Sequence, residues 1–181
     1  NLEIIISDDC SDNETKDYLK DISKNDQRIK LFFQEENLGW EKNFKFILDK
    51  SKGEYFKWAC QDDIISEDYI YSNYNFLKNN PDYVSSSSKF CYENKPEKIF
   101  SFNLDQNLYE RIKNFFKFRH ISHNVIYSLI RTEKIKNTID LSKQYWAIDW
   151  IINLELLLEG KFKTVENGLV KYGIHGFSKN K

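Results

Sequence analysis

The sequence predicts an α/β fold with a mostly parallel central sheet flanked by helices. Apolar runs of strand length alternate with segments of helical period through the first half of the chain, and this alternation is typical of a parallel sheet covered by helices. The 181 residues are 40% hydrophobic and 16% aromatic, which is enough for a hydrophobic core. No repeat, low-complexity segment or linker divides the chain, and we therefore expect a single domain over residues 1–181.

The first strands and helices follow each other closely. Residues 2–7 form a nearly continuous apolar run and predict a buried strand, whereas residues 13–23 repeat apolar side chains at helical spacing. Residues 29–33 predict the next strand, and the turn-forming residues 34–39 predict a loop. A second helix is expected to start at Trp40, where the apolar spacing becomes helical again.

The middle of the chain continues this alternation. The helix from Trp40 is expected to end by Gly53, and residues 55–60 predict a strand. Residues 66–80 predict a third helix, because the proline that follows cannot continue it. Residues 84–92 predict a further strand, and its run of serines favours an edge of the sheet over the centre.

The second half is less regular, but one helix stands out in it. Residues 149–159 carry isoleucine and leucine around most of the helix circumference, so we expect a largely buried helix that ends at Gly160. The other elements expected here are a loop or hairpin over residues 95–107, a helix over 108–118, and strands over 125–131, 162–165 and 169–174.

Charge and cysteine content exclude several classes of protein. The 27 basic and 28 acidic residues leave a net charge of −1, which provides no overall attraction to nucleic acid. No run approaches the roughly 18 uninterrupted apolar residues of a membrane span. Cys10, Cys60 and Cys91 lack the spacing of a metal site, and we interpret them as reduced thiols of a cytoplasmic protein.

Two acidic pairs follow two of the expected strands. Asp8 and Asp9 come directly after the first strand, and Asp62 and Asp63 come after the third. Ligands of parallel α/β sheets bind at the carboxyl ends of the strands, so we expect both pairs to face one cleft. Adjacent carboxylates repel each other, and a hard divalent cation such as Mg²⁺ or Mn²⁺ relieves the repulsion. The alternative is that these acids only form turns, cap a helix and line a solvated loop.

Four motifs occur in a fixed order along the chain. They are Glu3-Ile4-Ile5-Ile6-Ser7-Asp8-Asp9-Cys10-Ser11-Asp12-Asn13, Asn37-Leu38-Gly39, Gly53-Glu54-Tyr55-Phe56 and Gln61-Asp62-Asp63. In this order and spacing they resemble the family 2 glycosyltransferases of the GT-A fold, closely over about the first 80 residues and more loosely beyond. The resemblance implies a nucleotide-sugar donor, a divalent metal and inverting transfer to an acceptor hydroxyl. It implies that residues 1–90 bind the nucleotide-sugar and residues 91–181 bind the acceptor and carry the catalytic base.

The resemblance also implies that the chain lacks the first strand and helix of the family. That strand normally lies between the strand at residues 2–7 and the strand at residues 55–60. We therefore expect a domain that is incomplete at its N-terminus and has unpaired inner strand edges.

Individual acids receive roles from the same resemblance. Asp9 is expected to accept a hydrogen bond from the N3–H group of uracil, a donor that cytosine lacks, and this favours a UDP-sugar. Asp8 and Asp62 are expected to bind the nucleotide-sugar as well, with Asp62 near the ribose. Asp63 is expected to ligate Mn²⁺ or Mg²⁺, although the aspartate-any-aspartate motif of the family has Gln61 in its first place here.

Two further site residues are expected near the end of the chain. Asp149 precedes the buried helix, as the catalytic base does in the resembled family, although its usual acidic neighbour is Ile148 here. Its alternative role is a helix N-terminal acid. His175 lies where some family members place a metal-binding histidine and would complete the Asp63 site, or else it is a surface residue. Trp146 and Trp150 flank the base and would stack on a sugar, or else belong to the core.

A basic aromatic stretch at residues 111–120 would border the acceptor site or an anionic membrane surface that carries a lipid-linked acceptor. The alternative is an amphipathic helix with Ile112, Phe115, Phe116 and Phe118 in the core. The usual bacterial setting of the family implies surface polysaccharide synthesis, in the cytoplasm or at the inner face of the cell membrane.

Two other functions stay open from the residues alone. One is a non-catalytic nucleotide-sugar-binding fragment. The other is a receiver-like phosphoryl-transfer domain, because doubly wound folds of that type also collect aspartates at strand ends. The sequence has no Gly-rich phosphate loop, which argues against enzymes that use nucleoside triphosphates.

Overall fold

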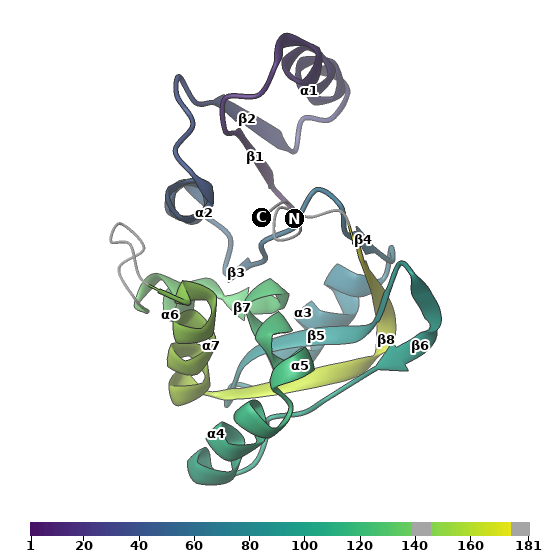
Figure 1. Ribbon diagram of the computed structural model, residues 1–181, viewed down its shortest axis with the longest axis vertical. Helices are drawn as coiled ribbons and strands as arrows, with labels where there is room; N and C mark the ends of the chain where they lie inside the picture. Colours follow the sequence, from purple (N-terminus) through teal and green to yellow (C-terminus); the bar gives the residue numbers. More distant parts are fainter. Residues whose placement is uncertain (139–145, 175–181) are drawn as a thin grey trace.

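The computed structural model describes residues 1–138 and 146–174, so the predicted ligand His175 lies outside the described residues (Figure 1). The strands are β1 (Ile4–Asp8), β2 (Ile29–Phe33), β3 (Tyr55–Phe56), β4 (Ile64–Ile65), β5 (Tyr83–Tyr92), β6 (Lys95–Phe100), β7 (Leu129–Arg131) and β8 (Lys161–Tyr172). The helices are α1 (Asn13–Asn25), α2 (Trp40–Lys50), α3 (Tyr69–Asn79), α4 (Leu108–Lys117), α5 (Arg119–Ser122), the 3-10 helix η1 (His123–Tyr127), α6 (Thr132–Lys136) and α7 (Ile148–Glu159). The predicted α/β class is confirmed.

The strands form two separate sheets. β1 and β2 pair in parallel and lie with α1 apart from the larger sheet (Figure 1). The larger sheet has the order β3-β7-β5-β8-β4, and β6 pairs with β5. Within the described residues β1 pairs only with β2 and β3 only with β7, so no strand pairing joins the two sheets. The carboxylate of Glu3 connects β1 to the segment before β3, because it accepts the N–H groups of Lys52 and Gly53 at 2.7 and 3.0 Å.

The prediction of a mostly parallel sheet is wrong for the larger sheet, which is mixed. Only β5 and β8 are parallel in it, whereas the β3-β7, β4-β8, β5-β6 and β5-β7 pairs are antiparallel. The regular alternation of strands and helices ends at α3, after which the chain folds back through the β5-β6 hairpin. Apolar runs alone do not reveal the direction in which such strands pair.

Strand β5 lies inside the sheet, although its serines favoured an edge. β7 and β8 pair with it on either side, and the side chains from Val84 to Ser88 are all buried. Ser88 Oγ donates to the carbonyl of Asn167 at 2.9 Å, and Ser87 Oγ lies 3.2 Å from the Tyr69 hydroxyl. These two buried hydroxyl groups therefore have partners inside the protein. Because serine side chains are small, α3 can also pack closely on β5.

Four other predicted strands have different bounds. The strand expected over residues 55–60 is only β3, and the run at residues 125–131 begins as η1 and becomes extended only in β7. The two strands expected between residues 162 and 174 are one strand, β8, with an irregular register opposite Ser88. Gly168 lies just before the point where the register resumes at Leu169, and its φ is +84°. A Cβ atom at this position would lie 2.5 Å from Ser88 Oγ, so both the backbone angle and the space require glycine.

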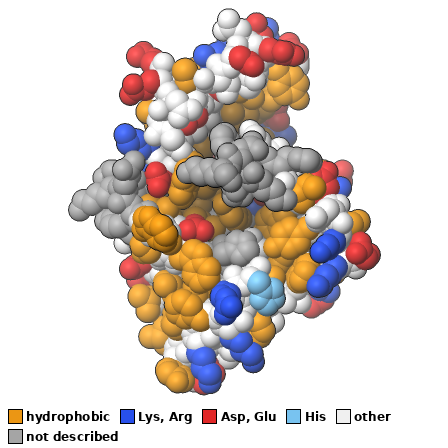
Figure 2. All heavy atoms as spheres, in the orientation of Figure 1, with side chains coloured by type: hydrophobic (Ala, Val, Ile, Leu, Met, Phe, Trp, Pro, Cys, Tyr) orange, Lys and Arg blue, Asp and Glu red, His pale blue; other side chains and the backbone are white. Residues whose placement is uncertain are grey.

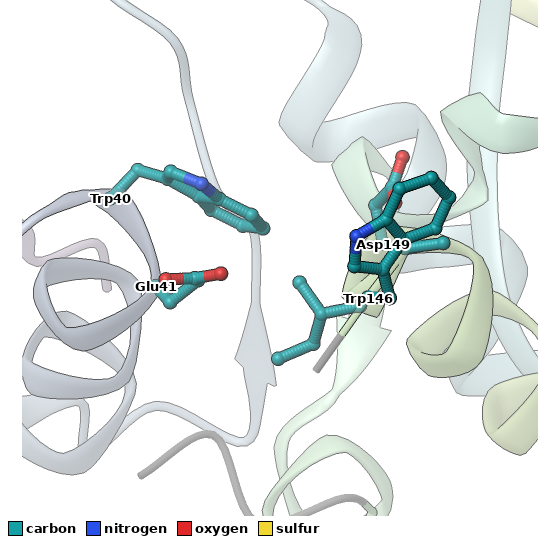
Figure 3. A pocket seen from close by; sticks show the side chains of 6 residues that line it. Trp40, Glu41, Trp146 and Asp149 are labelled. Carbon is teal, nitrogen blue, oxygen red and sulfur yellow. The ribbon is translucent and has the colours of Figure 1, made fainter. Parts of the chain in front are cut away.

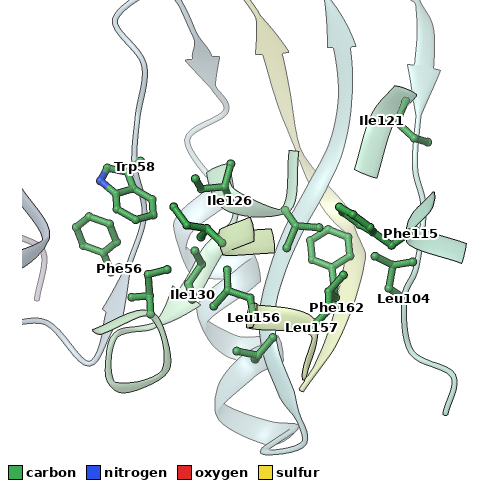
Figure 4. Packing of buried hydrophobic residues seen from close by; sticks show 14 of the residues in the cluster. Phe56, Trp58, Leu104, Phe115, Ile121, Ile126, Ile130, Leu156, Leu157 and Phe162 are labelled. Atoms are coloured by element: carbon green, nitrogen blue, oxygen red, sulfur yellow. The ribbon is translucent and has the colours of Figure 1, made fainter. Parts of the chain in front are cut away.

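Helix α7 lies in the core, as predicted, and is held at its C-terminal end. Its inward-facing side chains are at most 1% exposed, and they are Ile148, Ile152, Leu156 and Leu157. Figure 4 shows Leu156 and Leu157 in the packed cluster with Phe162. The guanidinium of Arg111 in α4 donates to the carbonyls of Leu157 and Gly160 at 2.7 and 2.6 Å, which satisfies the end of the helix. Core packing along α7 and the hydrogen bonds at its end therefore fix the position of this helix, which carries Asp149 in its first turn.

Candidate functional site

The first acidic pair closes β1 and shapes the loop beside it. Asp8 is the last residue of β1, and its buried side chain accepts the N–H group of Ser11 at 3.2 Å. The carboxylate of Asp9 accepts the N–H groups of Leu38 at 2.7 Å and Gly39 at 3.1 Å. Two of the sequence motifs therefore meet at this point, and Asp9 orients the segment that leads into α2.

The second acidic pair lies against the end of β8. Asp62 and Asp63 precede β4, which pairs with β8, and the N–H group of Gly173 donates to Asp63 Oδ1 at 3.1 Å. A Cβ atom at Gly173 would lie 2.5 Å from the carbonyl oxygen of Asp62, so a larger residue could not pass this close without a shift of the backbone. His175 follows two residues later in the sequence, outside the described residues.

The surroundings of Asp63 disfavour a negative charge. Burial raises the pKa of Asp63 and the neighbouring Asp62 adds to the rise, whereas the hydrogen bond from Gly173 and the charge of Lys57 act in the opposite direction. A bound cation would relieve this destabilisation. Over residues 1–138 and 146–174, no three His, Cys, Asp or Glu side chains gather as a ready metal site. One or two carboxylates nevertheless fit Mg²⁺ or Mn²⁺, which take further ligands from water and phosphate oxygens.

Asp149 lines a cavity of about 350 Å³ together with residues from another part of the chain. Figure 3 shows Trp40 and Glu41, at the start of α2, opposite Trp146 and Asp149, at the start of α7. Sequence reasoning found Asp149 but missed Trp40 and Glu41 as site residues. Their only signal was an aromatic and an acidic residue directly after the Asn37-Leu38-Gly39 motif.

The two tryptophans that flank Asp149 have different surroundings. Trp146 is 97% exposed at the cavity. Trp150 packs against Phe115 and Phe116, with ring centroids 5.4 and 6.3 Å apart. Trp146 is therefore the one that is free to contact a ligand, whereas Trp150 belongs to the edge of the core.

Tyr127 lies within electrostatic reach of both Asp63 and Asp149, and sequence reasoning did not single it out. Burial raises the pKa of Tyr127, and the charges of Cys60, Asp149 and Asp63 raise it further. The nearby Cys60 is partly buried, and burial raises the pKa of its thiol to about 11. The charges of Asp63 and Asp149 therefore both disfavour ionisation of the Tyr127 hydroxyl group.

The exposed face of α4 combines aromatic and basic side chains. Tyr109 and Phe116 are 73% and 47% exposed, and Lys113 and Lys117 are exposed beside them. Figure 2 shows basic side chains next to hydrophobic ones in this region, at the bottom of the view. The placement of Phe116 in the core is therefore wrong, because Phe115 takes the buried position and the next residue points about 100° further around the helix.

No helix in the described part of the chain is long and apolar enough to span a membrane.

The sequence matches a known protein family. The model described as glycosyl transferase family 2 matches residues 1–137 of the chain. An uncharacterized glycosyltransferase of Haemophilus influenzae is 32% identical over 80 residues, which are 44% of this chain and 32% of that protein. The putative teichuronic acid biosynthesis glycosyltransferase TuaG of Bacillus subtilis is 33% identical over 75 residues, which are 41% of this chain and 30% of that protein. The chain thus spans about a third of the length of the curated relatives it matches.

Comparison with solved structures gives the fold. The structure of residues 1–349 of S. aureus TarS in complex with UDP-GlcNAc matches with a TM-score of 0.73 at 17% sequence identity. The match covers 96% of this chain and 50% of that chain. Likeness at this level of identity establishes the architecture, so the predicted GT-A fold is confirmed, with a mixed sheet.

Proposed function

Since the chain belongs to glycosyl transferase family 2, we propose that it catalyses the metal-dependent, inverting transfer of a sugar from a UDP-sugar to a hydroxyl group of a glycan or lipid-linked acceptor. The observation that carries the proposal is the family match over residues 1–137, and the cavity that Asp149 lines together with Trp40 and Glu41 supports it. A nucleotide-sugar bound at the acidic pair would then have the base within reach of its acceptor.

The donor would bind through the two acidic pairs. Each carboxylate oxygen of Asp9 accepts one backbone N–H group and retains a lone pair for the N3–H group of uracil. Asp8 supports the turn that carries Asp9, and Asp62 would lie near the ribose. The UDP-GlcNAc in the TarS complex supports the choice of a UDP-sugar.

Asp63 is the residue that would hold Mn²⁺ or Mg²⁺, and His175 is proposed as a second ligand. When bound, such an ion neutralises the charge that develops on the diphosphate leaving group. The chain supplies a half-buried carboxylate whose orientation is fixed by the N–H group of Gly173. Partial burial limits the access of water to that carboxylate.

Asp149 would be the general base. The acceptor sugar would enter the cavity, where Trp40 and Trp146 offer apolar faces for the ring and Glu41 accepts hydrogen bonds from its hydroxyl groups. The carboxylate of Asp149 would take the proton of the acceptor hydroxyl group while the oxygen of that hydroxyl group bonds to the anomeric carbon of the donor sugar. The diphosphate would leave with its electron pair from the opposite face, and the configuration would be inverted.

The biological setting that we propose is bacterial surface polysaccharide synthesis in the cytoplasm. The name of the B. subtilis relative, which refers to teichuronic acid, supports this setting. A lipid-linked acceptor is presented at the inner face of the cell membrane, and the aromatic and basic face of α4 is suited to contact an anionic lipid surface.

Substitution of the base tests the proposed reaction. We expect Asp149→Asn to lower the rate of UDP release from a UDP-sugar panel, with Mn²⁺ present and water as acceptor, by about 100-fold or more. The affinity for UDP should stay within about twofold of the wild type, because the base does not bind the nucleotide. Glu155→Gln, an exposed carboxylate of the same helix, is the matched control. UDP release at the wild-type rate would remove Asp149 as the base, and a wild type that binds UDP but cleaves no donor would be a non-catalytic binder.

A further inference from the structure

Lys57 is a partly buried cation close to the second acidic pair, and the proposed reaction does not use it. Its ammonium group donates to the carbonyl of Trp58 at 3.2 Å and to the carbonyl of Tyr127. The same group lies 5.1 Å from the ring centroid of Tyr69, a side chain with no exposed surface. The charged end of Lys57 therefore points into the protein instead of extending to the solvent, as lysine side chains usually do.

The surroundings of Lys57 compensate its charge only in part. In the described part of the chain no salt bridge involves Lys57. Burial lowers the pKa of Lys57 to about 8, and the charges of Asp63 and Cys60 oppose this change. A charged ammonium group removed from water destabilises the folded protein unless hydrogen-bond acceptors or nearby negative charges compensate it. The carbonyl groups of Trp58 and Tyr127 are such acceptors here.

The contacts of Lys57 join both halves of the site. Residues 60–63, which we call the acidic loop, follow Lys57 closely, and Tyr127 ends η1, which packs against the helix of Asp149. The hydrogen bond from Lys57 to the carbonyl of Tyr127 ties the segment that leads into the loop to η1. The Tyr127 side chain and Cys60 of the loop also lie within electrostatic reach of each other.

We propose that Lys57 is a positioning residue whose ammonium group holds the acidic loop against η1 and thereby fixes the place of Asp63 relative to Asp149. The anchoring of the loop is a property of the chain itself. Its consequence for catalysis rests on the proposed function.

Amide hydrogen exchange of the metal-free chain tests the anchoring. In Lys57→Met we expect exchange in peptides that contain residues 59–63 and Gly173 to be about tenfold faster, with the rest of the chain unchanged. The segment that leads into the loop loses the hydrogen bond of Lys57 to η1, and Asp63, which accepts the N–H group of Gly173, is then held less firmly. Lys136→Met is the matched control, since Lys136 also donates to a backbone carbonyl, that of Ser51 at 2.8 Å, away from the loop. Should Lys57→Met fail to fold, Lys57→Gln replaces it. Exchange in the loop equal to that of the control, or faster exchange throughout the chain, would overturn the proposal.

A second measurement connects the loop to catalysis. Lys57→Met should release UDP from UDP-sugar at least about tenfold more slowly while one UDP still binds per chain with an affinity within about twofold of the wild type. A general loss of folded protein would instead lower the number of binding sites. Unchanged release in Lys57→Met would overturn the catalytic part. Absence of UDP binding by the wild type would contradict the proposed function, and the exchange measurement would still decide on the anchoring.

Discussion

Burial and the neighbouring Asp62 raise the pKa of Asp63, so the folded chain holds this proton more tightly than the unfolded chain does. Between the unfolded and the folded pKa the native state binds more protons, and the free energy of unfolding therefore falls as the pH rises through that window. Above this pH window the carboxylate is ionised in both states, and the free energy of unfolding stays lowered by the full amount. Without a cation, Asp63 thus destabilises the protein at neutral pH, as functional carboxylates often do.

This cost can be measured with an isosteric amide. We expect Asp63→Asn to raise the free energy of unfolding of the metal-free protein by about 0.5–1 kcal/mol at pH 7, because the amide oxygen still accepts the N–H group of Gly173 and carries no charge. The gain should vanish below about pH 3.5, where wild-type Asp63 is protonated in both states. Urea unfolding in the presence of a chelator measures both values, with the exposed Asp21→Asn of α1 as control. A lower free energy of unfolding for Asp63→Asn than for the wild type at pH 7 would show that burial of the ionised Asp63 does not destabilise the protein.

The acids of the site could be predicted from the sequence, but the groups around them could not. Asp9 directly follows β1, as predicted, whereas β3 already ends at Phe56 and Asp63 directly precedes β4 instead of ending a strand. Trp40 and Tyr127 become site residues only through contacts between segments far apart in the chain. Lys57 reads as an ordinary polar residue of a strand, because its burial depends on Tyr69 and on η1.

At the scale of single elements, periodicity predicted helices better than strands. α7 was predicted closely because its apolar residues surround the helix. β5 was misplaced because the hydrogen-bond partners of Ser87 and Ser88 lie in α3 and β8 and cannot be read from the strand itself. Helix α4 shows a mixed result, since Phe115 is buried as predicted and Phe116 is exposed.

The exposed face of α4 leads to a prediction about lipid surfaces. We expect the protein to co-sediment with vesicles of phosphatidylglycerol and phosphatidylcholine, and the double charge reversal Lys113→Glu and Lys117→Glu to weaken binding at least about tenfold. Lys20→Glu with Lys24→Glu in α1 has the same spacing and the same change of net charge, and it should bind like the wild type. Equal binding of the two double variants would contradict a specific contact through α4.

At the scale of the whole molecule, the acidic pairs come from two sheets that share no strand pairing in the described chain. Asp9 belongs to the β1-β2 unit and Asp63 to the larger sheet, so the nucleotide would bridge them. The division into residues 1–90 and 91–181 stays a prediction, and β5 (Tyr83–Tyr92) runs across the boundary between the two parts. Local patterns could not indicate this, because the pairing of β5 with β8 joins residues about 80 positions apart.

Calorimetric titration of UDP in the presence and absence of Mn²⁺ tests whether Asp63 holds a metal ion at a nucleotide site, when carried out on the wild type, on Asp63→Asn and on the control Asp21→Asn. We predict that the wild type and the control bind UDP in a manner that depends on Mn²⁺, and that Asp63→Asn weakens this binding at least about tenfold. Failure of the wild type to bind UDP, or binding that neither Mn²⁺ nor the Asp63→Asn substitution changes, would contradict this prediction.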